Sequence, residues 1–387
     1  MSKLFKKTPL AWRLLTKQKA RFVVALAGIA FADVLMFVQL GFEGALYDAA
    51  IKPYNALDAD LIMANPQFQT LISVDTSPRE RLYQTLSYPG VESVSSLYIG
   101  TAELRNPDTL KNRSILVWGI EPESPSFKLP ELAQNVDQLK QLNTILFDSA
   151  SRSEYGPIAQ TFSENGTAEV QLSKKTVRVG GLFAIGSSFA ADGNIITSDS
   201  TFLQLFPDHK AEDIEVGLIH VKPGTDIAAL KAQMQQSLPN DVRVLTPEEF
   251  GAVEKEYWAN GTSIGFIFGI GVIMGFIVGI VIVYQILYSD VSDHLAEFAT
   301  LKAMGYSDRY LVLMLMQEAL LLSLFGFLPS FLLSIGLYQI TYAATMLPIA
   351  MKLDRAINVL ILTIVMCTVS GAIAIRKLQA ADPADVF

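Results

Sequence analysis

The chain has 387 residues, of which 51% are hydrophobic and 18% charged, and its mean hydropathy is +0.34. It is too apolar for an ordinary soluble protein and too charged to lie wholly in a membrane, so we expect membrane spans combined with a folded aqueous part. Residues 45–258 hold 17 Lys and Arg against 28 Asp and Glu, a net charge of −11 (17 − 28), and this acidity argues against nucleic acid as a partner.

The N-terminal segment, residues 1–21, contains seven Lys and Arg and no acid. The positive-inside rule therefore predicts a cytoplasmic N-terminus, with a basic helix lying at the membrane interface. Residues 22–44 are the first predicted span, which we interpret as a retained anchor because its apolar run is too long for a signal peptide. Asp33 interrupts this span near its middle, where an acid is costly. We favour a structural role for it at a helix interface, and the alternative is a proton or substrate contact.

Residues 45–258 are the predicted aqueous domain. Strand-like and helix-like runs alternate in two groups, on either side of an irregular, proline-containing middle at about residues 121–167. The pattern predicts an α+β module built from both ends of this segment, with an inserted subdomain at its tip.

A helix start is encoded at Thr246, where an N-cap threonine is followed by Pro247 and by Glu249, which completes a capping box. We predict one continuous helix from there to Ser289, roughly 60 Å long at about 1.5 Å per residue. Its second part, residues 259–289, is the second predicted span. Glycines at four-residue spacing predict close helix packing, against either a second copy of the chain or the first span: Gly265, Gly269, Gly271, Gly275 and Gly279.

Residues 290–309 form a short polar segment between two apolar runs. Helical periodicity places Leu295, Phe298 and Leu301 on one arc, although His294 and Lys302 share it. Such a segment either lies in the lipid interface or is a stiff lever that another protein can push. Gly305 is the predicted end of this helix, and Ser307 the predicted N-cap of the next.

The last third of the chain contains two further predicted spans. They are residues 310–340, which carry Glu318, and residues 357–375, with a short loop at 341–356 and a tail at 376–387. Four spans place both termini on the cytoplasmic side and the large domain outside. We therefore predict an α-helical membrane protein with four transmembrane helices and a large α+β periplasmic domain between spans 1 and 2.

Three stretches resemble one family of membrane proteins. EFATLKAMGYSDRYL (297–311) is similar to the coupling segment of FtsX- and MacB-like ABC transporter permeases, and QEALLLSLFGFLPS (317–330) to their third span. VRVGGLFAIGSSFAADGNIITSDSTFLQLFP (177–207) resembles the DevC branch of that family.

This resemblance implies a MacB-like fold with a porter-like base, in an inner-membrane protein of a bacterium, specifically a cyanobacterium. It implies a separate DevA-like ATPase that binds ATP and Mg, a second copy of this chain, a DevB-like periplasmic adaptor, a TolC-like outer-membrane channel, and a glycolipid-like amphiphile from the membrane or periplasm as cargo. This chain itself would bind no cofactor. The residues expected to contact the ATPase are His294, Leu295, Glu297, Phe298, Leu301, Lys302, Met304 and Gly305.

No catalytic pattern is visible in the sequence. It has no G-x-x-x-x-G-K-[ST] phosphate loop and no G-x-S-x-G elbow, its three histidines are too dispersed for a zinc signature, and its one cysteine, Cys367, lies in an apolar run. Together with the resemblance, this absence leads us to expect a non-catalytic permease subunit of an ABC exporter. An FtsX-like transmitter that controls a cell-wall hydrolase is the alternative, and a membrane-anchored enzyme is the least favoured.

Overall fold

The computed structural model describes residues 19–71, 73–297, 300 and 304–380. These residues divide into two compact units, one made of the segments up to Ala45 and from Ser263 onward, the other of Leu46–Thr262. The large domain is thus enclosed in the chain between the first and second long helices, as the sequence predicts. The predicted basic interfacial helix at residues 1–21 lies almost wholly outside the described residues.

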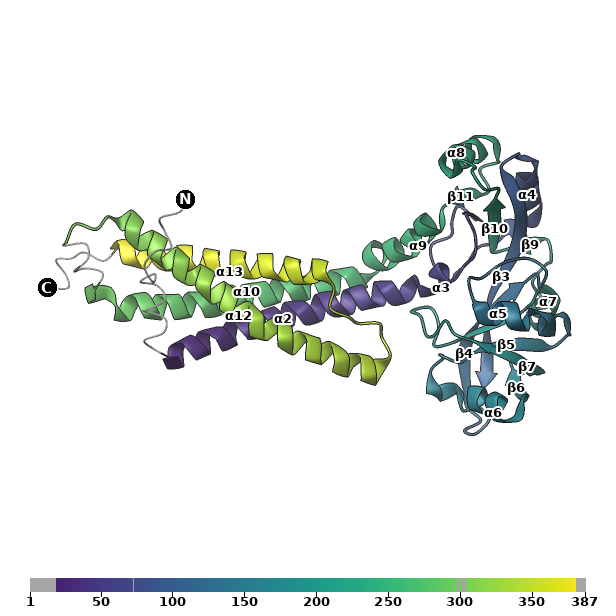
Figure 1. Cartoon of the computed structure of the whole chain (residues 1–387), viewed down its shortest axis with the longest axis horizontal. Helices are drawn as coiled ribbons and strands as arrows, with labels where there is room; N and C mark the ends of the chain where they lie inside the picture. The colour runs from purple at the N-terminus through teal and green to yellow at the C-terminus, as the bar shows by residue number, and fades with distance from the viewer. Residues whose placement is uncertain (1–18, 72, 298–299, 301–303, 381–387) are drawn as a thin grey trace. The chain divides into compact units, whose positions relative to one another are not determined.

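The first unit consists of four long helices that run alongside one another (Figure 1). Each of the four contains an apolar window long enough to cross a membrane. They are α2 (Lys19–Ala50), α10 (Ser263–Asp293), α12 (Asp308–Thr345) and α13 (Leu353–Ala380). The fold class predicted from the sequence, four spans with an α+β domain between the first two, is confirmed.

The second unit is built on a nine-stranded mixed sheet with the strand order β11-β1-β10-β3-β4-β8-β5-β7-β6. Both faces of this sheet are covered. In β1, Leu61 and Met63 belong to one buried cluster, and Ile62 and Ala64 to the cluster on the opposite face. Strands buried on both faces read as continuous apolar runs rather than as alternating ones, which is why LIMA here carries no polar residue.

The strands of this unit are β1 (Leu61–Ala64), β2 (Ser77–Pro78), β3 (Val91–Arg105), β4 (Asn112–Ile120), β5 (Thr144–Asp148), β6 (Ala168–Leu172), β7 (Lys175–Phe183), β8 (Asn194–Ser198), β9 (Asp213–Ile214), β10 (Val216–Val221) and β11 (Arg243–Leu245). Its helices are α3 (Lys52–Asn55), α4 (Arg79–Gln84), α5 (Pro130–Asn135), α6 (Ile158–Asn165), α7 (Asp199–Leu205), α8 (Ile227–Ser237) and α9 (Pro247–Glu256), with 3₁₀ turns at Thr85–Ser87, Val136–Lys140 and Ser153–Tyr155.

The two predicted groups of strands interleave in one sheet, because β10 and β11 of the second group flank β1 of the first. The 15-residue strand β3 joins them, because it pairs with β10 through its first part and with β4 and β6 through its second. The prediction of an irregular middle at residues 121–167 was wrong, because this stretch contains α5, α6 and the strand β5. The run TILFD forms β5, which lies between β8 and β7, a position that depends on partners distant in sequence.

The prediction of one continuous helix from Thr246 to Ser289 was also wrong. The capping box at its start is present, but α9 ends at Glu256, a π-helical turn follows at Tyr257–Gly261, and Thr262 is extended. The Thr262 hydroxyl donates to the Trp258 carbonyl 2.7 Å away. This bond offers the Trp258 carbonyl a side-chain donor at a point where Asn260 and Gly261 weaken helical continuity.

Candidate functional site

The segment between α10 and α12 holds the residues expected to contact an ATPase. After α10 ends at Asp293, the chain turns at His294 and is helical again at residues 295–297. Glu297, Met304 and Gly305 are exposed, and the Met304 side chain is 64% exposed. Phe298, Leu301 and Lys302 lie outside the described residues.

Two of the predicted contact residues point inward in the described structure. Leu295 packs against a buried cluster that includes Val291 and Leu315, and His294 is only 5% exposed. The inward orientation arises because the helical stripe that includes Leu295 continues the buried face of α10 into the turn. Among the predicted contact residues that the structure describes, Glu297 and Met304 therefore have the accessible side chains.

The boundary with α12 agrees with the sequence. Gly305 has φ +92°, the left-handed conformation that commonly ends a helix and that favours glycine. Ser307 occupies the N-cap position of α12, which begins at Asp308, although its side chain makes no capping hydrogen bond. A sharp reversal between two long helices is thus encoded locally.

Buried polar groups lie where α10 meets α12. The His294 ring nitrogen Nδ1 lies 3.0 Å from the Asp290 carbonyl oxygen and 3.5 Å from the Asp290 carboxylate. Glu318, predicted to be an intramembrane acid, is 2% exposed and faces Asp290. These groups bring the end of α10 and the third turn of α12 together by polar contacts.

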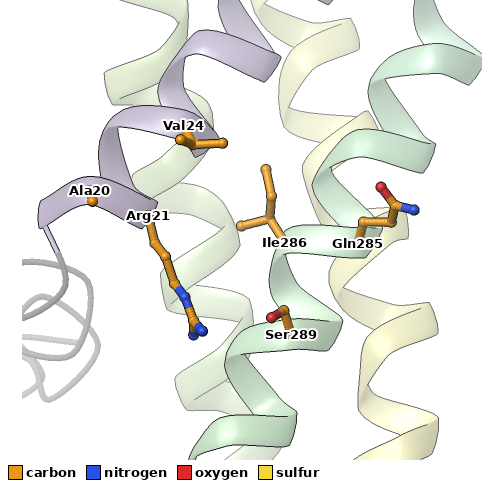
Figure 2. A pocket seen from close by; sticks show the side chains of 6 residues that line it. All are labelled: Ala20, Arg21, Val24, Gln285, Ile286 and Ser289. Carbon is orange, nitrogen blue, oxygen red and sulfur yellow. The ribbon is translucent and has the colours of Figure 1, made fainter.

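A cavity of about 290 Å³ opens between α2 and α10 near the same end of the helices. Arg21 and Val24 line it from α2, and Ile286 and Ser289 from α10 (Figure 2). Arg21 forms an ion pair with Asp293, and both side chains remain partly exposed. No feature of the sequence pointed to this cavity, because residues at its two walls are more than 260 positions apart.

The intramembrane acid Asp33 is fully buried. One carboxylate oxygen accepts a hydrogen bond from the Ser330 hydroxyl on α12 at 3.1 Å, and the other from the Thr363 hydroxyl on α13 at 2.8 Å. Asp33 thus joins three helices. Polar contacts of this kind hold helices together in lipid, as the structural interpretation expects.

The glycines predicted to form a packing ridge on α10, Gly265, Gly269, Gly271, Gly275 and Gly279, pack in part against the first span. A Cβ atom added at Gly271 would lie 2.4 Å from the Gln39 side chain, and one added at Gly275 would lie 3.1 Å from Met36, both on α2. Gly279 approaches Ala32 and Met366. Gly269 has open space around it. Of the two partners left open by the spacing, the first span is therefore the one that this ridge contacts within the chain.

A second close approach involves α2 and α12. Tyr338 donates its hydroxyl hydrogen to the Phe37 carbonyl oxygen, and its ring lies against Gly41. Arg355, at the start of α13, is 7% exposed, stacks on the Tyr338 ring at 5.5 Å, and lies against Gly44. Only residues without a Cβ admit the ring and the guanidinium at these distances. The sequence analysis did not single out either glycine.

In the second unit, the buried carboxylate of Glu254 organises the end of α9. Its Oε1 accepts hydrogen bonds from the Thr70 hydroxyl (2.8 Å) and the Trp258 indole (2.7 Å). Its Oε2 accepts from the Leu71 amide (2.9 Å) and from the Tyr54 hydroxyl. Burial raises the pKa of Tyr54 well above its usual value, with a further contribution from Glu254, so the phenol stays protonated as a donor. Four donors satisfy one charge that would otherwise be costly to bury.

Among the residues that the structure describes, no group of three or more His, Cys, Asp or Glu side chains could hold a metal ion. The arrangement of buried acids with hydroxyl, indole and amide donors is one that joins helices and loops.

Comparison with known proteins finds a family match in the last third of the chain. Residues 261–383 match the model of the FtsX-like permease C-terminal domain. Over these residues the chain is similar to that permease domain. The match takes in α10, α12, α13 and the segment between α10 and α12, so the predicted coupling residues lie within the matched stretch. The comparison with curated proteins gives no match.

Solved structures resemble this chain only weakly. The periplasmic region of MacB from Actinobacillus actinomycetemcomitans is 12% identical, with a TM-score of 0.34, over 52% of this chain and 93% of that one. The extracellular domain of the noncanonic ABC-type transporter YknZ from Gram-positive bacteria is 12% identical, with a TM-score of 0.33, over 49% of this chain and 99% of that one. Neither score establishes a shared fold with the second unit.

Proposed function

We propose that this chain is the membrane subunit of an ABC exporter and that a separate, DevA-like ATPase drives it. The observation that carries this proposal is the match of residues 261–383 to the FtsX-like permease domain. Support comes from the short segment held between α10 and α12, whose exposed Glu297 and Met304 are available to a partner. The ATP and Mg would be bound by that ATPase.

In this proposal both termini and the segment at residues 290–309 are cytoplasmic, because residues 1–21 carry seven cations and no acid. The second unit is then periplasmic, in a bacterial inner-membrane protein. Movement of the ATPase would displace the segment, and α10 would pass the displacement on. Since α9 and α10 are separated by a π-helical turn and the extended Thr262, movement does not pass along one unbroken helix.

The finer assignments rest on the sequence resemblance to the DevC branch. They are a second copy of the chain, a DevB-like adaptor, a TolC-like channel and expulsion of a glycolipid-like amphiphile from the periplasm or the membrane. The acidic charge of residues 45–258 disfavours an anionic polymer as cargo but does not distinguish among amphiphiles.

The test is a change of charge in the exposed part of the segment. Met304→Asp should abolish most of the stimulation of the partner ATPase by this chain, because a carboxylate placed in a docking contact is desolvated without a partner. Leu110→Asp is the matched control, since Leu110 is similarly exposed, at 59%, but lies in the second unit. Full ATPase stimulation by the Met304→Asp protein, with the chain folded and inserted, would contradict the docking role.

A mild-detergent pull-down of the wild-type chain separates export from the alternative function. Recovery of an ATPase together with an adaptor and an outer-membrane channel supports export. Recovery of an ATPase with a peptidoglycan hydrolase, and no channel, would instead identify a signal transmitter of the FtsX kind.

A further inference from the structure

The cavity between α2 and α10 lies where both helices change from apolar to polar sequence. On α2, Arg21 is followed by the apolar run that begins at Phe22, and on α10 the apolar run ends just before Ser289. In a membrane this boundary is the level at which lipid headgroups meet acyl chains. A molecule in the cavity would therefore contact both layers.

The walls of the cavity are likewise divided into an apolar side and a polar side. Val24 and Ile286 form its apolar side, while Arg21, Gln285 and Ser289 bring polar groups (Figure 2). Gln285 and Ser289 are exposed, and neither makes a side-chain hydrogen bond with the residues that the structure describes. An amide and a hydroxyl at the edge of an apolar span thus remain available to a ligand.

The charge at the cavity favours an anion. The Arg21 guanidinium carries five N–H donors, and its ion pair with Asp293 leaves its side chain 47% exposed. Lys19, two residues before Arg21, is exposed, and the sequence before it adds five further cations and no acid. Arginine beside an apolar wall is a favourable arrangement for a phosphate ester with attached acyl chains.

We propose that this cavity binds the headgroup of an anionic phospholipid from the adjacent leaflet. The phosphate diester accepts hydrogen bonds from the Arg21 guanidinium, with the Ser289 hydroxyl and Gln285 amide as further donors. The first methylenes of the acyl chains lie along Val24 and Ile286. This proposal requires only that α2 and α10 cross the membrane, so it does not depend on the transport function.

The experiment is native mass spectrometry of the full chain released from nanodiscs that contain phosphatidylglycerol and phosphatidylcholine. The wild-type protein should retain phosphatidylglycerol in preference to phosphatidylcholine, and excess inorganic phosphate should not displace it. Arg21→Gln should lower the retained phosphatidylglycerol about tenfold, the loss expected for one charge-assisted hydrogen bond. Lys19→Gln is the matched control, because it removes the same charge from the same turn of α2 outside the cavity.

A second pair of variants leaves the ion pair intact. Val24→Trp fills the cavity and should also lower retention, because the indole occupies the space that the lipid would take. Val23→Trp places the same side chain at the neighbouring position, which is equally exposed (62% against 63%) but does not line the cavity, and should retain lipid like the wild type. Asp293→Asn, which frees Arg21 from its partner, should not lower retention.

Three results would overturn the proposal. The first is equal retention of both lipids by the wild-type protein, and the second is an equal loss in Lys19→Gln or Val23→Trp, which would indicate a general surface effect. The third is a gain of phosphatidylglycerol only after residues 2–16 are deleted, which would show that the N-terminal segment of this chain, and not a lipid, occupies the cavity.

Discussion

Replacing Glu254 by Gln should destabilise the second unit by about 3 kcal/mol, because the substitution leaves a buried donor without an acceptor. Each carboxylate oxygen accepts two hydrogen bonds, Oε1 from Thr70 and Trp258, Oε2 from Leu71 and Tyr54. The amide nitrogen of Gln must take the place of one oxygen. A hydroxyl facing it can rotate and become an acceptor, but the Trp258 indole and the Leu71 amide cannot. In either orientation of the amide, one N–H group therefore faces another.

The loss of stability can be measured both for the whole unit and at a single backbone amide. For a unit the size of Leu46–Thr262, about 3 kcal/mol corresponds to a fall in Tm of about 6–12 °C. Thermal unfolding of the full chain in detergent measures this change, and hydrogen exchange in residues 65–76 should show faster exchange of the Leu71 amide. Glu248→Gln is the matched control, since it makes the same change on α9 at an exposed position. If the Glu254→Gln protein melts within a degree of that control, the hydrogen-bond network does not stabilise the unit as argued.

Two further predictions concern the other unit and pH. Gly41→Ala should lower the Tm of the membrane unit, because its Cβ would lie 2.4–2.6 Å from the Tyr338 side chain, whose hydroxyl is held by a hydrogen bond. Gly269→Ala is the control and should have no effect, because Gly269 has open space around it. Equal Tm values for the two variants would refute this prediction. The pKa of His209 is raised by its hydrogen bond to Glu215. The protonated imidazole therefore contributes its full stabilisation to the folded state below the unfolded pKa of about 6.5, and this stabilisation is lost as pH rises through the folded pKa. The difference in Tm between wild type and His209→Asn should therefore be larger at acid than at alkaline pH, and a constant difference from pH 5 to pH 9 would show that the imidazolium is not involved.

Several features of this protein are readable from local sequence. The four apolar runs locate the four long helices, because length and hydropathy are properties of contiguous residues. The capping box at Thr246 and the left-handed Gly305 are likewise encoded within a few positions. The β-branched and aromatic residues of β3 and β4 predict these two strands.

Other features were decided only by tertiary structure, because they depend on residues that meet across large sequence separations. The sequence left the partner of the α10 glycines open, and Met36 and Gln39 on α2 turned out to face them. The run at β5 joined the sheet through partners on both sides.

The candidate sites, too, combine features that local sequence predicts with features that only the tertiary structure determines. Spacing alone marked the segment between α10 and α12, yet it could not tell that Leu295 packs inward while Met304 is exposed. The four donors around Glu254 and the cavity beside Arg21 had no signal in the sequence. A local pattern specifies which element forms, whereas burial, hydrogen-bond satisfaction and cavities are set by what the folded chain brings alongside it.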